Sequence, residues 1–409
     1  MQLTTDAKRA ARLVRRVLRG RRAYFDLRDM VAQRGPLAQG TYRVGVYFAD
    51  SDVNLYQMRQ WYAPLQELAR TFPVLLITRN AAGARALMQE SGLPVAFAPK
   101  VTQLEALVDE QPLEVVLYVN QNTRNFQMMR YGRRWHVFVN HGESDKMYMA
   151  SNQYKAYDYA LVAGDAARER LAQALWDYDV AERTIPIGRP QVDHFTGEPP
   201  FPVDERIVVL YAPTWEGDRP AARYGSIDSH GEALVQRLLA TGRHRVIYRP
   251  HPRSGVVDPD FGAANARIIA AIAAANRADP HAHHVFDDGP TLGWQLQRAD
   301  VAICDISAMV YDRLATGKPV LVTRPVATEA AVDETGYLSA CEWLDASDAP
   351  GIDLVLDRVL GDEEARARLG TWSQRYFGDT SPGAPTRRFH EAIALLLARA
   401  DAWKARVSS

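Results

Sequence analysis

The sequence has only two cysteines, Cys304 and Cys341, among its 409 residues. Two cysteines cannot supply a disulfide framework or the four ligands of a zinc site, so the sequence favours a reduced, cytoplasmic setting. It also lacks long apolar runs. No stretch approaches the roughly 18 consecutive apolar residues of a spanning helix, and the N-terminus has no hydrophobic signal core. We therefore expect a chain that is neither secreted nor transmembrane.

Charge is balanced overall, with 49 basic and 49 acidic residues, but it is unevenly placed. Residues 1–22 contain a single acidic residue beside Lys8, Arg9, Arg12, Arg15, Arg16, Arg19, Arg21 and Arg22. At helical period the apolar residues form one narrow stripe, which predicts a basic amphipathic N-terminal segment over residues 1–35. Such a segment suits the anionic inner face of the cell membrane. A helix docked on the protein and a nucleic-acid contact are the alternatives.

Short β-branched or aromatic runs alternate with helical stretches through most of the chain. A first series comprises residues 42–48, 74–78, 95–98, 115–119, 137–139 and 160–162. A second series comprises residues 207–211, 245–248, 284–286, 301–304 and 320–323. Strands separated by helices predict βαβ units and mainly parallel sheets, so the fold class is α/β.

The length and this alternation predict two Rossmann-like domains that face each other across a cleft. The proline-rich segment 185–205 predicts an extended linker. We place the N-terminal domain at 36–190 and the C-terminal domain at 191–380. A periodic helix over about 386–407, within a final segment 381–409, is expected to pack back toward the N-terminal domain.

The segment that begins at Val301 suggests an anion site. Its strand ends at Asp305, and Ser307 then opens a helix that runs to about Thr316. Ser307 is a favourable N-cap, and the backbone N–H groups behind it suit a phosphate or diphosphate. The alternative is that Ser307 only caps a structural helix and Asp305 only balances its dipole.

Two histidines follow predicted strands in settings that suit proton transfer. His251 lies between Pro250 and Pro252, and it can donate to a phosphate or a leaving group with Arg249 as a nearby positive charge. His141 precedes a glycine, Gly142, that permits a turn, and it is a candidate general base. Glu143 or Asp145 is expected to orient its ring. A structural histidine is the alternative at both places.

Taken in order, these segments resemble the CDP-glycerol glycerophosphotransferase family of teichoic acid and capsule enzymes. His141-Gly142 followed by Lys146 is similar to the family's His-Gly-Thr-Pro-Leu-Lys, and residues 211–215 read Tyr-Ala-Pro-Thr-Trp as in the family. Residues 249–252 resemble its x-x-His-Pro. Residues 303–312, with Lys318-Pro319 after them, resemble its Ile-Thr-Asp-Tyr-Ser-Ser-x-x-Phe-Asp. The resemblance spans about residues 135–325.

This resemblance implies a GT-B fold and an enzyme that moves a polyol phosphate from a CDP-activated donor to a hydroxyl of a cell-surface glycan or teichoic-acid-like acceptor, releasing CMP. The residues indicate no metal or other cofactor, and we expect no nucleic-acid partner. The catalytic residues it implies are His141 and His251. The donor and phosphate residues are Arg249, Asp305, Ser307, Ala308, Thr214 and Trp215, and the acceptor-side residues are Gly142, Glu143, Asp145 and Lys146.

Some residues depart from the family pattern or stand outside it. Glu143-Ser144-Asp145 replaces Thr-Pro-Leu, Ala308 replaces a serine, and Gln191 stands where arginine is usual. An acidic pair beside His141 would disfavour a polyanionic acceptor and suit a neutral hydroxyl. Asp312 is expected to be structural, and the Asp50-Ser51-Asp52 triplet is not expected to bind metal. We interpret residues 281–284, with three histidines, as a solvated loop.

Two other functions fit the same features. A GT-B glycosyltransferase or epimerase that uses a nucleotide sugar would share the fold and the phosphate site. A non-catalytic protein that binds membranes or polyanions would account for the basic N-terminus alone.

Overall fold

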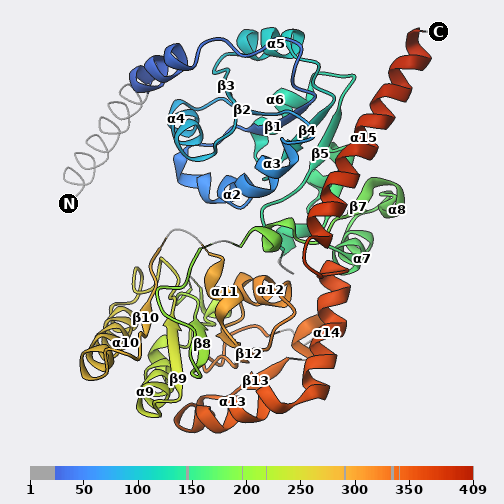
Figure 1. Ribbon diagram of the computed structural model, residues 1–409. Coiled ribbons are helices and arrows are strands. Elements are labelled where there is room, and N and C mark those ends of the chain that lie inside the picture. The colour runs from blue at the N-terminus through green and yellow to red at the C-terminus, as the bar shows by residue number, and fades with distance from the viewer. Residues whose placement is uncertain are drawn as a thin grey trace, which may run out of the picture.

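The computed structural model describes residues 24–143, 147–195, 197–217, 219–289, 292–332, 336–339 and 341–408. The expected basic stretch of residues 1–22 lies outside the described residues, as do Asp145 and Lys146. A helix over residues 24–34 is the first described element. The strands gather into two separate sheets, and the last two helices run along one side of both (Figure 1).

The first sheet is parallel and has the strand order β3-β2-β1-β4-β5-β6-β7. Its strands are β1 (Val44–Phe48), β2 (Val74–Thr78), β3 (Val95–Phe97), β4 (Val115–Tyr118), β5 (Trp135–Phe138), β6 (Tyr159–Val162) and β7 (Thr184–Pro186). Its helices are α2 (Leu55–Arg59), α3 (Tyr62–Leu68), α4 (Ala81–Glu90), α5 (Val101–Glu110), α6 (Phe126–Met129), α7 (Asp165–Ala174) and α8 (Val180–Arg183). β1 and β2 are buried along their whole length, because apolar side chains cover both faces of the sheet.

The second sheet is also parallel and has the order β10-β9-β8-β11-β12-β13. Its strands are β8 (Ile207–Ala212), β9 (His244–Tyr248), β10 (Val285–Phe286), β11 (Val301–Cys304), β12 (Val320–Thr323) and β13 (Glu342–Leu344). Its helices are α9 (Glu232–Ala240), α10 (Pro259–Ala278), α11 (Trp294–Arg298), α12 (Ala308–Leu314), α13 (Ile352–Gly361) and α14 (Glu363–Phe377). Cys304 is buried in β11, and both cysteines are free thiols.

Two strands occur where the sequence pattern predicts none. β7 lies inside the segment expected to be a linker, and it ends in Pro186. A proline is tolerated there because β7 is the last strand of its sheet and has one unpaired edge. β13 is a three-residue edge strand, too short to show a period. The connection between the sheets therefore begins after β7 and includes the short helix η5 (Pro190–His194).

The last helix, α15 (Ala384–Ser408), packs against the first sheet although it follows the second in the chain (Figure 1). Phe389, Ile393 and Leu396 are fully buried in the core cluster that contains β1, β2 and β4. The Leu396 carbonyl accepts a hydrogen bond from Trp135 Nε1 at 3.0 Å. The two halves are thus joined twice, by the segment after β7 and by α15.

Each sheet has one point where the strand order reverses direction. In the first sheet it lies between β1 and β4, and in the second between β8 and β11. At such a point the loops that leave the two strands turn to opposite faces, which opens a crevice at the carboxyl ends. These two crevices are where ligands are expected to bind.

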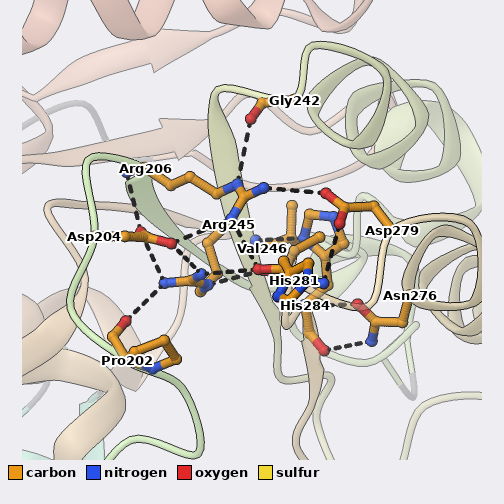
Figure 2. Close-up of polar contacts among 11 residues, drawn as sticks. Pro202, Asp204, Arg206, Gly242, Arg245, Val246, Asn276, Asp279, His281 and His284 are labelled. Atoms are coloured by element: carbon orange, nitrogen blue, oxygen red, sulfur yellow. Dashed lines mark hydrogen bonds and ion pairs between the residues drawn. The ribbon is translucent and has the colours of Figure 1, made fainter.

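A cluster of charged residues marks the opposite, amino-terminal edge of the second sheet (Figure 2). Arg245, near the start of β9, is almost fully buried and binds the Asp204 carboxylate and the Ala282 carbonyl. His284 is also buried, and its Nδ1 accepts from the Val246 N–H at 3.1 Å. Burial lowers the pKa of His284 to about 4. This histidine is a structural acceptor, which corrects the expectation of a solvated loop over residues 281–284.

Candidate active site

His141 lies at the first crevice, just past the carboxyl end of β5. The preceding Asn140 adopts a left-handed conformation, φ +57°, which asparagine tolerates better than most residues. Its side-chain amide donates to the Gly142 carbonyl at 2.7 Å, and its carbonyl accepts from Trp61 Nε1 at 2.5 Å. These contacts hold the turn that presents His141.

The ring of His141 is fixed in one tautomer. Its Nδ1 lies 3.0 Å from the Val119 carbonyl oxygen, which can only accept, so Nδ1 carries the proton. Nε2 is then the nitrogen with the lone pair. Burial lowers the pKa of His141, opposed by the Val119 hydrogen bond and reinforced by Arg189, so the ring is neutral near pH 7. This is the protonation state of a general base.

The Val119 carbonyl, at the end of β4, orients the ring in place of the expected carboxylate. Glu143 is buried and forms an ion pair with Arg170. Its charge is therefore balanced inside the protein, and it is not an exposed negative group beside the acceptor. Glu143 is therefore not expected to repel a polyanionic acceptor, which corrects the expectation from the sequence.

A pocket of about 340 Å³ adjoins His141. The ends of β1, β4 and β5 contribute to its wall, together with η1 (Asp52–Asn54) and α2. Tyr56 packs edge-on against the His141 ring, with the ring centroids 5.9 Å apart. The histidine thus borders a cavity at the point where the strand order of this sheet reverses.

At the second crevice Asp305 is a buried anchor. Its side chain is fully buried, and it accepts from the Thr214 N–H at 2.8 Å, the Ser226 N–H at 3.1 Å and the Thr323 hydroxyl at 2.5 Å. Burial raises the pKa of Asp305 to about 6, against these hydrogen bonds. The carboxylate positions the loops after β8 and β11, and its full burial leaves it inaccessible to a phosphate, which corrects its expected place among the phosphate-binding residues.

Ser307 precedes α12, as expected, but its side chain does not cap the helix. Its Oγ is buried with no hydrogen-bond partner in the described part of the chain, and its backbone is extended at φ −158°. Ala308, the first residue of α12, is exposed. The helix has seven residues and ends at Leu314, somewhat before the expected Thr316.

Arg249 follows β9 and is engaged by a carboxylate. Its Nη1 lies 2.5 Å from Asp287 Oδ2, and its Nη2 donates to the Gly289 carbonyl at 3.1 Å. Because Asp287 balances its charge, Arg249 stabilises the loop after β10. The fixed positive charge that was expected near His251 is therefore paired with a carboxylate.

His251 is exposed at the same edge and stacks on Trp215, with ring centroids 6.3 Å apart. Its Nδ1 accepts from the Arg253 N–H at 3.1 Å, so Nε2 carries the proton of the neutral ring. The Arg253 guanidinium also lies over the Trp215 ring, with its carbon 3.8 Å from the ring centroid. His251 and Arg253 therefore place a hydrogen-bond donor and a cation close to Trp215, and an anionic substrate requires groups of these two kinds.

Arg189 connects the two crevices. Its Nη2 lies 2.5 Å from Asp312 Oδ1 on α12, and both side chains are largely buried, at 7% and 12% exposure. A Cβ added at Gly142 would lie 3.8 Å from Nη1 of the same guanidinium. Burial raises the pKa of Asp312, and Arg189 opposes that shift. Asp312 is structural, as expected, and its partner comes from the other half of the chain.

Three residues of the two crevices were missed from the sequence, namely Asn120, which lines the pocket beside His141, Arg253 and Arg189. A signal was present for one of them. Asn120 ends the buried run of β4 and begins a polar run, Asn-Gln-Asn, which is the same pattern that marks His141. Arg253 and Arg189 carry no such signal. Each becomes recognisable only when its partner, Trp215 or Asp312, is placed beside it.

Two Rossmann-like domains with a candidate site at each switch point define a protein of the GT-B fold class. The chain matches the family described as CDP-glycerol:poly(glycerophosphate) glycerophosphotransferase over residues 83–326, more than half of its length. The chain belongs to this family and is an enzyme of this transferase type. A comparison with curated protein sequences finds no significant match.

Solved structures with the same fold are distant in sequence. The wall teichoic acid polymerase TagF is 13% identical, with a TM-score of 0.56 over 88% of this chain and 90% of that chain. A protein assigned as a UDP-N-acetylglucosamine 2-epimerase from Listeria monocytogenes is 14% identical, with a TM-score of 0.53 over 85% and 95%. A glycosyltransferase from Rickettsia africae is 11% identical, with a TM-score of 0.50 over 87% and 99%. These likenesses confirm the GT-B fold.

Proposed function

We propose that this enzyme transfers glycerol phosphate from CDP-glycerol to an acceptor hydroxyl and releases CMP. The observation that carries the proposal is the fixed tautomer of His141, whose Nδ1–H is held by the Val119 carbonyl. That bond leaves Nε2 as a neutral base beside a pocket. Membership of the glycerophosphotransferase family supplies the donor class.

His141 acts on the acceptor. Its Nε2 takes the proton of the acceptor hydroxyl while the oxygen attacks the phosphorus that carries glycerol. The bond from that phosphorus to the CMP oxygen breaks, and CMP leaves with the electron pair. The acceptor is then a glycerol phosphodiester, and the proton remains on His141 until solvent removes it.

The loops after β8, β9 and β11 act on the donor. His251 donates from Nε2 to the departing phosphate, and Arg253 supplies positive charge next to it. The backbone N–H groups that follow Ser307 bind the diphosphate. Thr214 and Trp215 line the same side, and Asp305 holds their loop in place.

Release of CMP tests the reaction. The full chain is incubated with CDP-glycerol, CDP-ribitol or UDP-N-acetylglucosamine, each with a panel of glycan acceptors, and CMP and UMP or UDP are measured by chromatography. We expect CMP release from CDP-glycerol that depends on acceptor. Turnover of the UDP-sugar but of neither CDP-polyol would assign a nucleotide-sugar enzyme instead.

The proposed acceptor is attached to the membrane, so the proposal also concerns how the enzyme reaches the membrane surface. No helix among the described residues is long and apolar enough to cross a bilayer. The excess of arginine in residues 1–22 would attract the chain to anionic lipids, each basic residue near the surface contributing about 1 kcal/mol. We propose that this segment holds the enzyme at the inner face of the membrane, where a lipid-linked acceptor would lie.

A further inference from the structure

The pocket beside His141 is lined by an unusual set of polar side chains. Six are carboxamides, namely Asn54, Gln57, Asn120, Gln121, Asn122 and Asn140. Among the described residues that line it, Asp50 is the only carboxylate, and there is no lysine or arginine. Carboxamides carry both a donor and an acceptor, which matches hydroxyl groups, whereas a phosphate diester offers acceptors only.

Asn120 organises this wall. Its Nδ2 donates to Asp50 Oδ2 at 2.8 Å and to Gln57 Oε1 at 2.8 Å, which uses both of its hydrogens. The Gln57 amide in turn donates to the Tyr56 hydroxyl at 3.3 Å. These contacts fix the orientation of the Asn120 amide, because a flipped amide would set its oxygen against two other acceptors.

The oxygen of Asn120 is left without a partner. The side chain is only 7% exposed, and Oδ1 is buried with no hydrogen bond among the described residues. An unmet buried acceptor costs about 1–3 kcal/mol, so a ligand that brings a donor to this pocket is favoured. A hydroxyl has such a donor. A phosphate that carries no proton does not.

Tyr56 adds an apolar surface to the same pocket. It is 52% exposed and stands edge-on to His141. An exposed aromatic face beside polar amides suits the C–H face of a sugar ring, whose hydroxyls project around its rim.

We infer that the acceptor of this enzyme is the neutral, polyhydroxylated end of a glycan, selected by Asn120, Gln57 and Asp50 against an end that already carries a phosphate. This inference rests on the proposed function and narrows its acceptor. It also implies the position of this step in the assembly of the chain, because the enzyme then adds the first glycerol phosphate to a sugar hydroxyl. A product that ends in glycerol phosphate is a poor acceptor for a second addition.

Two matched acceptors test the inference. One is the octyl glycoside of a neutral disaccharide, and the other is the same glycoside extended by one glycerol phosphate. With CDP-glycerol as donor we expect kcat/KM at least tenfold higher for the neutral acceptor, and mass spectrometry should show a single added glycerol phosphate. Equal or better use of the phosphorylated acceptor, or a ladder of products, would overturn the inference.

A charge change at the rim gives a sharper readout. Gln121 is half-buried, and its Oε1 accepts from the Ser151 hydroxyl at 2.6 Å. Gln121→Lys and Gln121→Met both lose that contact, but only the lysine brings a cation. We expect Gln121→Lys to use the phosphorylated acceptor, relative to the neutral one, at least tenfold better than Gln121→Met does. Equal ratios in the two variants would contradict selection by charge.

Binding separates this inference from the transferase proposal. Calorimetry of the full chain with each glycoside, without donor, requires no turnover. Tighter binding of the neutral glycoside supports the inference even where CDP-glycerol is not consumed, which would count against the donor assignment alone. Tighter binding of the phosphorylated glycoside overturns the inference whether or not CMP is released.

Discussion

The two crevices occupy equivalent places in two similar parallel sheets, yet they are built from different groups. The first is made of side chains: a carboxamide network around Asn120 and a histidine held by a carbonyl. The second is made of loops whose backbone is anchored by one buried carboxylate, Asp305, with an exposed histidine and arginine stacked on Trp215. Topology decides where a ligand binds in each half, and the local groups decide which ligand.

The difference matches two substrates of unlike charge. A diphosphate needs N–H donors and positive charge, which the second crevice offers through His251 and Arg253. A sugar hydroxyl needs mixed donors and acceptors and a base, which the first crevice offers through its amides and His141. The two substrates make different demands on the two halves. Variants in the first half should therefore impair use of the acceptor, and variants in the second half should impair binding of the donor.

The largest effect is expected at His141. In His141→Ala the acceptor hydroxyl has no base, so kcat should fall by about 10²–10⁴-fold while the Kd of CDP-glycerol stays within a few-fold, because the proposed donor contacts lie in the other half. Steady-state CMP release and calorimetry measure the two quantities. His281→Ala, at an exposed histidine far from both crevices, is the control and should behave as wild type. Turnover above a tenth of wild type would remove His141 from the base role.

The connection between the halves is the next test. Arg189→Ala leaves Asp312 buried without its partner, and we expect a loss of about 3–5 kcal/mol in the free energy of unfolding. Denaturant unfolding measures it. Arg243→Ala breaks an exposed ion pair with Asp357 and should cost no more than about 1 kcal/mol. Similar losses in the two variants would mean that the Arg189 pair does not join the halves.

The pH profile distinguishes the base from the donor site. His141 must be unprotonated to act, and burial holds its pKa below the ordinary value of about 6.5. kcat/KM for the acceptor should therefore be level near pH 7 and fall about tenfold per pH unit only below the lowered pKa. This fall in kcat/KM at low pH, the acidic limb of the profile, should be missing from the residual activity of His141→Ala. A limb that persists there belongs to another group.

A smaller effect is expected at the donor site. His251→Ala removes a donor to the phosphate, and Ser307→Pro imposes φ near −65° on a residue at −158°, which displaces the start of α12. Each should weaken CDP binding roughly tenfold, the value of one charge-assisted hydrogen bond. Calorimetry with CDP measures this. His281→Ala, at the opposite edge of the second sheet, is again the control. Unchanged affinity in both variants would place the donor elsewhere.

The smallest effect on turnover is expected from deletion of residues 1–22. Turnover on a soluble acceptor should stay nearly intact, since the residues proposed to act on donor and acceptor all come later in the chain, while cosedimentation with anionic liposomes should be lost. Binding by the full chain should weaken as salt rises, because surface charge is screened over about 8 Å at physiological ionic strength. If the full chain does not cosediment with anionic liposomes at low salt, the membrane proposal is wrong.

Much of the fold follows from patterns within the chain. Residues 74–78, 301–304 and 320–323 form the predicted strands with the same bounds, because buried parallel strands are continuous apolar runs that need no partner to be recognised. The GT-B class and the family are confirmed as well. The catalytic roles of His141 and His251 stay predictions, now with a tautomer assigned to each.

What the sequence determined by itself is therefore the order of most strands, with β7 and β13 the exceptions, the fold class, and the strand ends at which His141 and His251 lie. Only the tertiary structure decided what each polar group binds. Glu143 turned out to pair with Arg170, and Arg249 with Asp287. The physical reason is that periodicity is a local property, whereas burial and charge pairing depend on residues distant in the chain. Arg189 and Asp312 form an ion pair of 2.5 Å between the two halves, and the sequence around each of them does not predict this contact.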